Sequence, residues 1–230
     1  LISIVSFVLL NIALIHYFFK LKKNQTPKKA MFLKLSMLVS STLSIWALVL
    51  LFKGSTTAVN AVIVVMMTFF VLSTSAMFTF FLATKATPIG DIKVSVEDQL
   101  LPFKTENFNS DCLMGKRTLL KFYRGSWCPY CSAELKMFEE LKPKLDEYKI
   151  QILGVSNDSF EEQKAHQQRD NISHTLVSDP ELTIIRQYGV EHHKGIGAKG
   201  EKSLSVFGIS MPLPWQMKYQ PMSIPTSILI

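Results

Sequence analysis

Three long apolar segments dominate the first third of the chain. Residues 1–19 are apolar apart from four polar side chains, and a helix of this length reaches about 28 Å, close to the hydrocarbon thickness of a bilayer. Two further segments, 35–52 and 57–84, are bounded by lysine and contain no charge. A signal peptide would explain the first segment alone. We therefore expect three transmembrane helices, which form a membrane anchor over residues 1–85.

The lysines between these segments predict an orientation. The first connection, with the start of the second segment, holds six lysines, whereas the second connection holds only Lys53. Basic loops stay on the cytoplasmic side of a membrane. We expect the N-terminus outside and everything after Lys85 on the cytoplasmic face.

The charge distribution argues against a nucleic-acid partner. The chain carries a formal net charge of +7, but residues 1–85 contain eight lysines and no acidic residue. Residues 86–230 contain the remaining 17 basic residues and all 18 acidic ones, so this part of the chain is nearly neutral. No basic stripe is left there to follow a phosphate backbone.

Residues 86–230 have the composition and length of one domain, in which strand and helix patterns alternate. Residues 117–125 and 149–158 are typical of buried strands, and 132–148 has one apolar helical face. A helix over 159–170 opens with a capping box of Ser159 and Glu162. Later segments predict a short strand, a short helix and a last strand: "HTLVSD", "PELTIIRQYG" and "IPTSILI". This order favours a parallel or mixed α/β sheet.

Two of the three cysteines lie in "FYRGSWCPYC", between a strand and a helix. Cys128 would sit near the free N–H groups and positive dipole of the helix, which stabilise a thiolate. Cys131, one helical turn later, is placed to attack a mixed disulfide or a sulfenic acid on Cys128. Pro129 at the first helical position costs no hydrogen bond, and Trp127 would shield the sulfur.

Other uses of the two cysteines are less consistent with the sequence. A structural zinc site needs four ligands, and the only candidates to complete one, Cys112 and the pair His192–His193, have no recognised spacing. We interpret these two histidines as exposed loop residues, with a base near the thiols as the alternative, and Cys112 as an incidental loop residue. A structural disulfide would be unusual on a cytoplasmic face. We expect a reacting dithiol that needs no metal and no organic cofactor.

Several motifs in order carry a family resemblance. The segments "LLKFYRGSWCPYCSAEL", "ILGVSNDSFEEQKAHQQ" and "HTLVSDPELTIIRQYGV" resemble the peroxiredoxin-like branch of the AhpC/TSA (redoxin) family. The similarity covers about 87–190 and returns at "SIPTSILI". It implies a thioredoxin-like fold, a mixed sheet flanked by helices. The family's closing strand and C-terminal helix have no room before Ile230, so we expect a domain truncated at its C-terminus.

The resemblance also implies roles for residues. Cys128 would be the attacking, or peroxidatic, cysteine and Cys131 the resolving one, while Arg124 and its loop would bind substrate oxygens. The four residues from Cys128 to Cys131, with Tyr130, match the active site of glutaredoxins. The segment around Pro225 is similar to the one where thioredoxin-fold proteins place a cis-proline against the dithiol.

The implied partners follow from the same resemblance. They are a peroxide or a protein disulfide as substrate, a dithiol donor such as a thioredoxin or glutaredoxin system, and the lipid bilayer. A multi-pass anchor on such a domain suggests a bacterial inner membrane.

The sequence departs from the family beside the dithiol. Typical peroxiredoxins carry a threonine and a proline where this chain has Gly125 and Lys121, and Ser126 is the nearest hydroxyl. The threonine orients the peroxide, so its loss keeps a second hypothesis open, a thiol–disulfide oxidoreductase. A third is a membrane redox sensor without turnover. Residues 192–221 show only loose similarity, and we expect them to be a packing segment or a substrate-facing loop.

Overall fold

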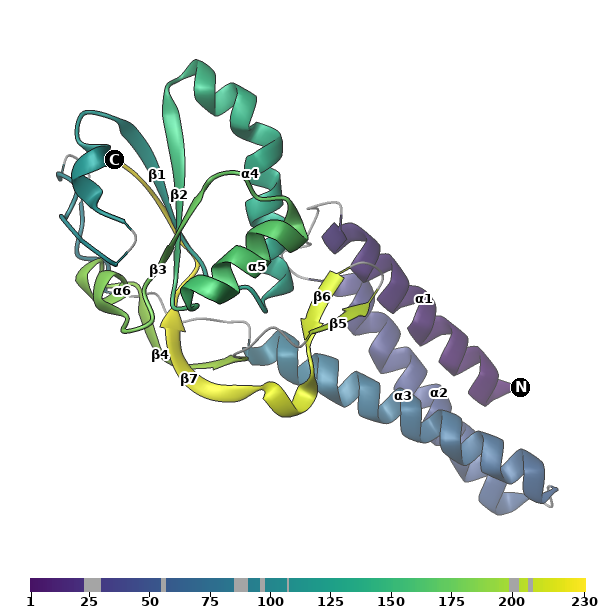
Figure 1. The fold of residues 1–230 in the computed structure, drawn as a ribbon. Coiled ribbons are helices and arrows are strands. Elements are labelled where there is room, and N and C mark those ends of the chain that lie inside the picture. Colours follow the sequence, from purple (N-terminus) through teal and green to yellow (C-terminus); the bar gives the residue numbers. More distant parts are fainter. Residues whose placement is uncertain are drawn as a thin grey trace. The chain divides into compact units, whose positions relative to one another are not determined.

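The chain divides into two compact units in the computed structural model, Leu1–Ala86 and Thr87–Ile230. The structure describes residues 1–22, 30–54, 57–84, 91–95, 98–106, 108–198, 203–206 and 209–230. Figure 1 shows the helices of the first unit and the α/β arrangement of the second.

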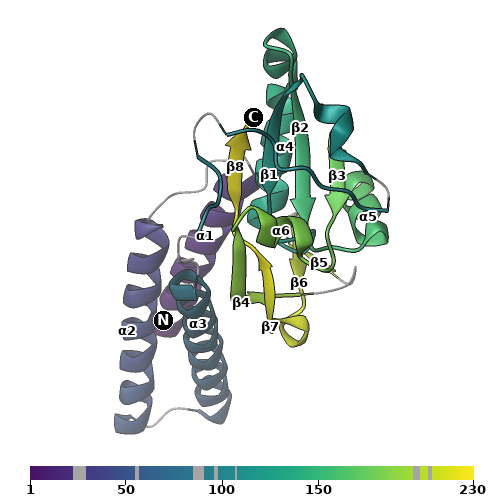
Figure 2. The ribbon, with the colours of Figure 1, turned by 90° about the vertical axis from the view of Figure 1, so that its left-hand side faces the viewer.

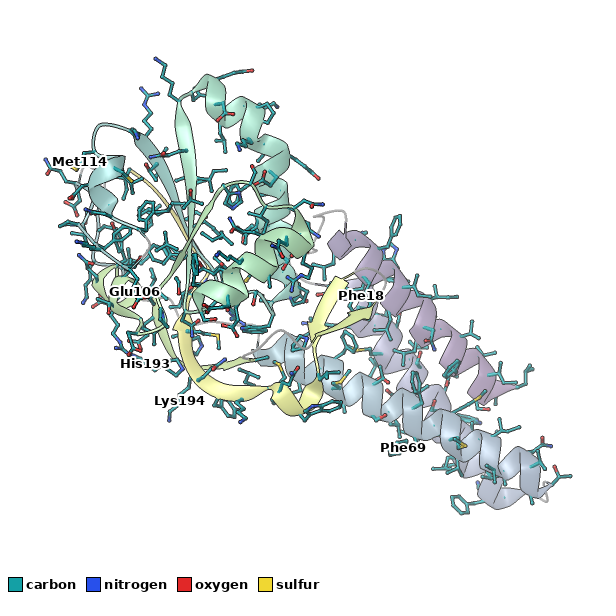
Figure 3. All side chains as sticks on the ribbon, viewed as in Figure 1. Phe18, Phe69, Glu106, Met114, His193 and Lys194 are labelled. Atoms are coloured by element: carbon teal, nitrogen blue, oxygen red, sulfur yellow. The ribbon has the colours of Figure 1, made fainter. Side chains whose placement is uncertain are left out.

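The first unit consists of α1 (Ile2–Lys22), α2 (Met31–Lys53) and α3 (Ala58–Thr84). Each contains a segment long and apolar enough to cross a membrane: Ile2–Leu21, Met31–Lys53 and Ala58–Phe80. Large apolar side chains such as Phe69, 73% exposed, point outward (Figure 3). Polar groups pair inside, where the Ser6 and Ser44 hydroxyls lie 2.5 Å apart. An apolar exterior around small hydrogen-bonded residues is typical of helices packed in lipid.

The second unit is built on a four-stranded mixed sheet, which Figure 2 shows. The strands are β1 (Arg117–Phe122), β2 (Ile150–Ser156), β3 (Thr175–Ser178) and β8 (Thr226–Leu229). Their order is β3-β2-β1-β8, in which β1 pairs parallel with β2 and antiparallel with β8. The predicted mixed sheet is confirmed, and the last strand lies next to the one that leads into the dithiol.

Helices cover both faces of this sheet (Figure 1). Those on one face are α4 (Pro129–Glu147) and α5 (Phe160–Asp170), and the other face carries α6 (Thr183–Gln187) and the 3-10 turn η1 (Ser110–Leu113). Successive side chains along β1 point to opposite faces of the sheet. Leu120 and Phe122 pack with Tyr188, which directly follows α6, whereas Tyr123, directly after β1, packs on the α4 side. This architecture confirms the predicted thioredoxin-like fold class.

Helix ends follow from capping groups, and they shift two of the predicted boundaries. The capping box of Ser159 and Glu162 is present, so α5 begins at Phe160. Helix α4 begins at Pro129, three residues before the expected start, because the Cys128 sulfur accepts the hydrogen bond of an N-cap. Helix α6 is only five residues long and follows Leu182, whose left-handed backbone (φ 61°) interrupts the predicted helix.

The segment after α6 forms antiparallel ribbons. Strand β4 (Glu191–Gly197) pairs with β7 (Lys218–Ser223), and β5 (Ser203–Val206) pairs with β6 (Ile209–Pro212), while η2 (Pro214–Gln216) is a 3-10 turn. The interpretation of His192 and His193 as loop residues is wrong, because both lie on β4. A β-bulge follows between His192 and Gly195.

Candidate active site

The two cysteines lie where β1 ends and α4 begins, in direct contact. Cys128 has extended backbone and caps the helix, and its sulfur accepts the backbone N–H of Cys131 at 3.4 Å. The Cys131 thiol donates to the same sulfur, with the two Sγ atoms 2.8 Å apart. Both thiols are free and buried, 5% and 2% exposed. The pair is therefore positioned for sulfur exchange without a large movement of the helix.

The surroundings of the two sulfurs distinguish them chemically. The hydrogen bond from Cys131 lowers the pKa of Cys128, and the positive charge of Arg124 lowers it further, although burial opposes both. Burial raises the pKa of Cys131 well above its usual value. Of the two thiols, Cys128 is thus the one that ionises more readily.

The wall around the dithiol combines residues next to it in the sequence with residues far away. Trp127 and Met222 pack with both cysteines in one buried cluster; its other members are Tyr123, Leu135, Ile172 and Ala198. A Cβ on Gly197 would lie 2.5 Å from the Met222 methyl and 2.8 Å from the Trp127 ring. Trp127 is in the position expected from the sequence, whereas the contact of Met222 was not expected. Glycines at 195 and 197 on one strand were the available signal of a close approach.

The loop before Cys128 explains why a threonine is absent. Gly125 has a φ of +143°, a conformation that side chains disfavour, and a Cβ there would lie 2.7 Å from both Asp158 Oδ1 and Trp127 Nε1. A threonine at position 125 does not fit this loop. Ser126 is held by its backbone: its N–H donates to Asp158 at 2.8 Å, and its carbonyl accepts from Arg169 Nη2 at 2.8 Å.

Comparison with known proteins identifies the family. The family model described as AhpC/TSA family matches residues 91–229, more than half of the chain. The chain belongs to the AhpC/TSA family. The predicted family and the predicted enzyme class, an oxidoreductase of the peroxiredoxin-like kind, are confirmed by this match and by relatives that are named peroxiredoxins.

The similarity to individual proteins of the AhpC/TSA family is moderate. A bcp-type peroxiredoxin of Coxiella burnetii is 32% identical over 99 residues, 43% of this chain and 66% of the relative. Peroxiredoxin Bcp of Escherichia coli is 28% identical over 112 residues, 48% of this chain and 69% of the relative. The chain therefore spans about two thirds of the length of these relatives. The crystal structure of peroxidoxin BcpB from Mycobacterium tuberculosis aligns with a TM-score of 0.40 at 19% identity, covering 63% of this chain and 79% of that one.

Most of the other expected site residues of this AhpC/TSA chain surround the dithiol. Pro129 occupies the start of α4, and Tyr130 packs against the buried cluster. Arg124 is partly buried, and its Nε has no hydrogen-bond partner among the residues that the structure describes. The expectation for Pro225 is wrong: its side chain is exposed and the peptide bond before it is trans, since no cis bond occurs in the described part of the chain.

A buried carboxylate and a buried phenol lie next to the loop. Asp158 is 6% exposed and accepts from the Ser156 hydroxyl at 2.9 Å, in addition to the bond from Ser126. Burial raises the pKa of Asp158 to about 6. Tyr123 is fully buried, and burial together with the charge of Asp158 raises its pKa well above the usual value. Tyr123 is therefore neutral, while Asp158 titrates near neutral pH.

A second polar cluster braces the first turns of α4 from α5. The Ser132 hydroxyl lies 3.0 Å from His166 Nε2 and accepts from Arg169 at 3.1 Å. Asp170 pairs with Arg169 at 2.9 Å and with Lys136 at 3.0 Å. Burial raises the pKa of Asp170, but hydrogen bonds from His166, Arg169 and Lys136 outweigh it and hold that pKa well below its usual range. Sequence reasoning missed this cluster.

The structure does not bring the third cysteine into the site. Cys112 lies exposed in η1, on the opposite face of the sheet from α4. No group of three or more His, Cys, Asp or Glu residues suited to a metal ion occurs in the part of the chain that the structure describes.

Proposed function

We propose that this AhpC/TSA-family chain is a membrane-anchored, thiol-dependent peroxidase that works through Cys128 and Cys131. One observation carries the proposal: the reduced Cys131 thiol lies 2.8 Å from the Cys128 sulfur and donates a hydrogen bond to it. The same contact favours the Cys128 thiolate and leaves the resolving thiol in place.

The reaction follows in two balanced steps. The Cys128 thiolate attacks the terminal oxygen of a hydroperoxide, an S–O bond forms, the O–O bond breaks, and the alkoxide takes a proton from solvent and leaves as the alcohol. Cys131 then attacks the sulfur of the resulting sulfenic acid. Its own proton joins the departing hydroxide as water, and a disulfide closes. An external dithiol, such as reduced thioredoxin, returns both thiols.

Burial of the attacking sulfur favours a small substrate. Cys128 is 5% exposed behind Trp127 and Met222, so a peroxide reaches it more easily than the disulfide of a folded protein does. The second candidate remains a thiol–disulfide oxidoreductase, which is favoured by Gly125 in place of the peroxide-orienting threonine. In the third candidate, a redox sensor, the dithiol would oxidise once without turnover.

The first unit serves as the anchor in this proposal. Its helices have the length and apolar surface of membrane spans, and the lysine-rich connection favours a cytoplasmic redoxin domain. A bacterial inner membrane fits these features. The external dithiol donor of this proposal would act on the same side of the membrane.

Turnover distinguishes the three candidates. The full chain in detergent is mixed with tert-butyl hydroperoxide or, separately, with an insulin-type disulfide, each with excess reduced thioredoxin. We expect catalytic consumption of the peroxide. Turnover of the disulfide alone would support the oxidoreductase, and a single stoichiometric oxidation with either substrate would support the sensor.

A further inference from the structure

His192 shares the face of the β4–β7 ribbon that covers the dithiol. In the antiparallel register it lies directly opposite Met222, and directly opposed residues project from the same face of a ribbon. Met222 is fully buried in the cluster that contains both cysteines. The half-buried His192 therefore projects toward the edge of the site, whereas the neighbouring His193 points away, 83% exposed (Figure 3).

Arg124 links His192 to the attacking cysteine. Its positive charge acts on the ionisation of both groups, because it lowers the pKa of Cys128 and also that of His192. The buried Arg124 Nε–H has no acceptor among the described residues. Buried donors are almost always satisfied in proteins, and an unpaired one beside a reactive group points to a missing acceptor.

The hydrogen bonds of His192 determine which ring nitrogen carries a proton. Nδ1 accepts the backbone N–H of Lys194 at 3.2 Å. A nitrogen that accepts carries no proton, so the neutral ring bears its hydrogen on Nε2. Burial, and then the charge of Arg124, lowers the pKa of His192, which keeps the ring neutral at physiological pH. His192 thus offers one fixed donor, Nε2–H, at the edge of the dithiol.

We propose that His192 is a catalytic residue that, together with Arg124, binds the oxygens of the hydroperoxide. The inference rests on the proposed peroxidase function. As the Cys128 thiolate attacks the terminal oxygen, the O–O bond breaks and negative charge develops on the leaving oxygen. Nε2–H of His192 and the guanidinium of Arg124 donate hydrogen bonds to this charge, and solvent supplies the proton that converts the alkoxide into the alcohol. The pair performs the task for which typical peroxiredoxins use the threonine that Gly125 replaces.

Two conservative variants separate this role from a structural one. His192→Asn places an amide oxygen near the position of Nδ1, which retains the bond from Lys194 but removes the distal donor. His192→Gln places an amide N–H near the position of Nε2, which retains the distal donor but removes the acceptor. His193→Asn is the matched control on the exposed side of the same strand.

The readouts are the second-order rate of oxidation by tert-butyl hydroperoxide and the rate of alkylation by iodoacetamide, both measured on the folded full chain in detergent. For His192→Asn we expect the peroxide rate to fall about 100-fold, the effect of losing one transition-state donor, at an unchanged alkylation rate. His192→Gln should regain at least a tenth of the wild-type peroxide rate, and His193→Asn should match wild type. If His192→Gln fails to fold, the rate of His192→Asn decides. If His192→Asn fails to fold, a more than tenfold loss of peroxide rate in His192→Gln counts against the donor role.

Three results would overturn the inference. A peroxide rate for His192→Asn within threefold of wild type shows that the donor is not used. A larger loss of peroxide rate in His192→Gln than in His192→Asn shows that His192 acts by accepting the backbone N–H of Lys194. A wild-type chain that does not react with peroxide at all refutes the proposed function itself, and with it this role.

Discussion

The carboxylate of Asp158 accepts a hydrogen bond of 2.8 Å from the backbone N–H of Ser126, two residues before Cys128. The backbone carbonyl of Ser126 accepts a hydrogen bond from Arg169 at 2.8 Å. Ser126 is therefore held on both sides, by the end of β2 and by the last turn of α5. Since the loop leads directly into Cys128, these two bonds position the capping sulfur and the Trp127 ring.

The buried Asp158 predicts a specific pH dependence of stability. Its pKa is about 6 in the folded chain against 3.8 in the unfolded one, so the folded state binds the proton more tightly. The contribution of Asp158 to the free energy of unfolding then falls as pH rises from about 4 to 6, by roughly 3 kcal/mol in total, and is constant above that range.

Asp158→Asn removes this titration but keeps an acceptor for Ser126. The difference in unfolding free energy, variant minus wild type, should therefore rise between pH 4 and 6.5, as measured by urea denaturation in detergent. A difference that stays constant with pH would show that Asp158 does not titrate in this range.

Loss of the hydrogen bond from Arg169 to the Ser126 carbonyl should make the position of Cys128 less well defined. Arg169→Met leaves the Ser126 carbonyl without its charged donor, and we expect a loss of about 1–3 kcal/mol of stability together with a changed alkylation rate of Cys128. Arg186→Met is the control, because this exposed side chain pairs with Glu191 away from the dithiol. Equal effects of the two substitutions in urea denaturation and alkylation would refute the positioning role of Arg169.

Much of the fold could be predicted because its signals are local. The Ser159–Glu162 capping box, the strand before Cys128 and the lysine-bounded apolar segments each lie within a few turns of the chain, and each element appears close to its expected place. The early start of α4 also has a local cause, but one that requires treating a thiol as a capping group.

The rest of the site depends on contacts that the sequence pattern does not reveal. Met222 reaches the dithiol from 91 positions beyond Cys131 in the printed sequence, in a segment where the family resemblance is loosest. The two hydrogen bonds of Ser126 are made by its backbone N–H and carbonyl. The backbone is the same whatever the residue type, so the sequence carries no sign of these bonds. The cis-proline expectation for Pro225 came from resemblance alone, and the trans geometry contradicts it.

Restoring the family's threonine should not restore a family-like site. Gly125→Thr introduces a branched side chain at a φ of +143° and against Asp158, so we expect lower stability and a slower reaction with peroxide. Gly115→Ala is the control for backbone strain alone, because φ there is +73° but no atom lies within 4 Å of the new Cβ. A Gly125→Thr protein that reacts faster than wild type would show that the loop accommodates the hydroxyl.

The exposed Cys112 reports the side of the membrane on which the redoxin domain lies, since Cys128 and Cys131 are buried. A membrane-impermeant maleimide should label Cys112 only after cells are permeabilised. Gly54 directly follows α2, in the connection that we expect outside the cell. A cysteine placed there by Gly54→Cys, in a Cys112→Ser background, should be labelled in intact cells. Labelling of Cys112 in intact cells would reverse the proposed topology.

The most direct test of the central claim, attack by Cys128 and resolution by Cys131, is intact-protein mass spectrometry after one equivalent of hydroperoxide. We predict that wild type loses two hydrogens as a disulfide between Cys128 and Cys131. The Cys131→Ser protein should gain one oxygen on Cys128, and the Cys128→Ser protein should stay unmodified at Cys131. Oxygen on Cys131 in the Cys128→Ser protein, with no reaction in the Cys131→Ser protein, would contradict the assignment of both roles.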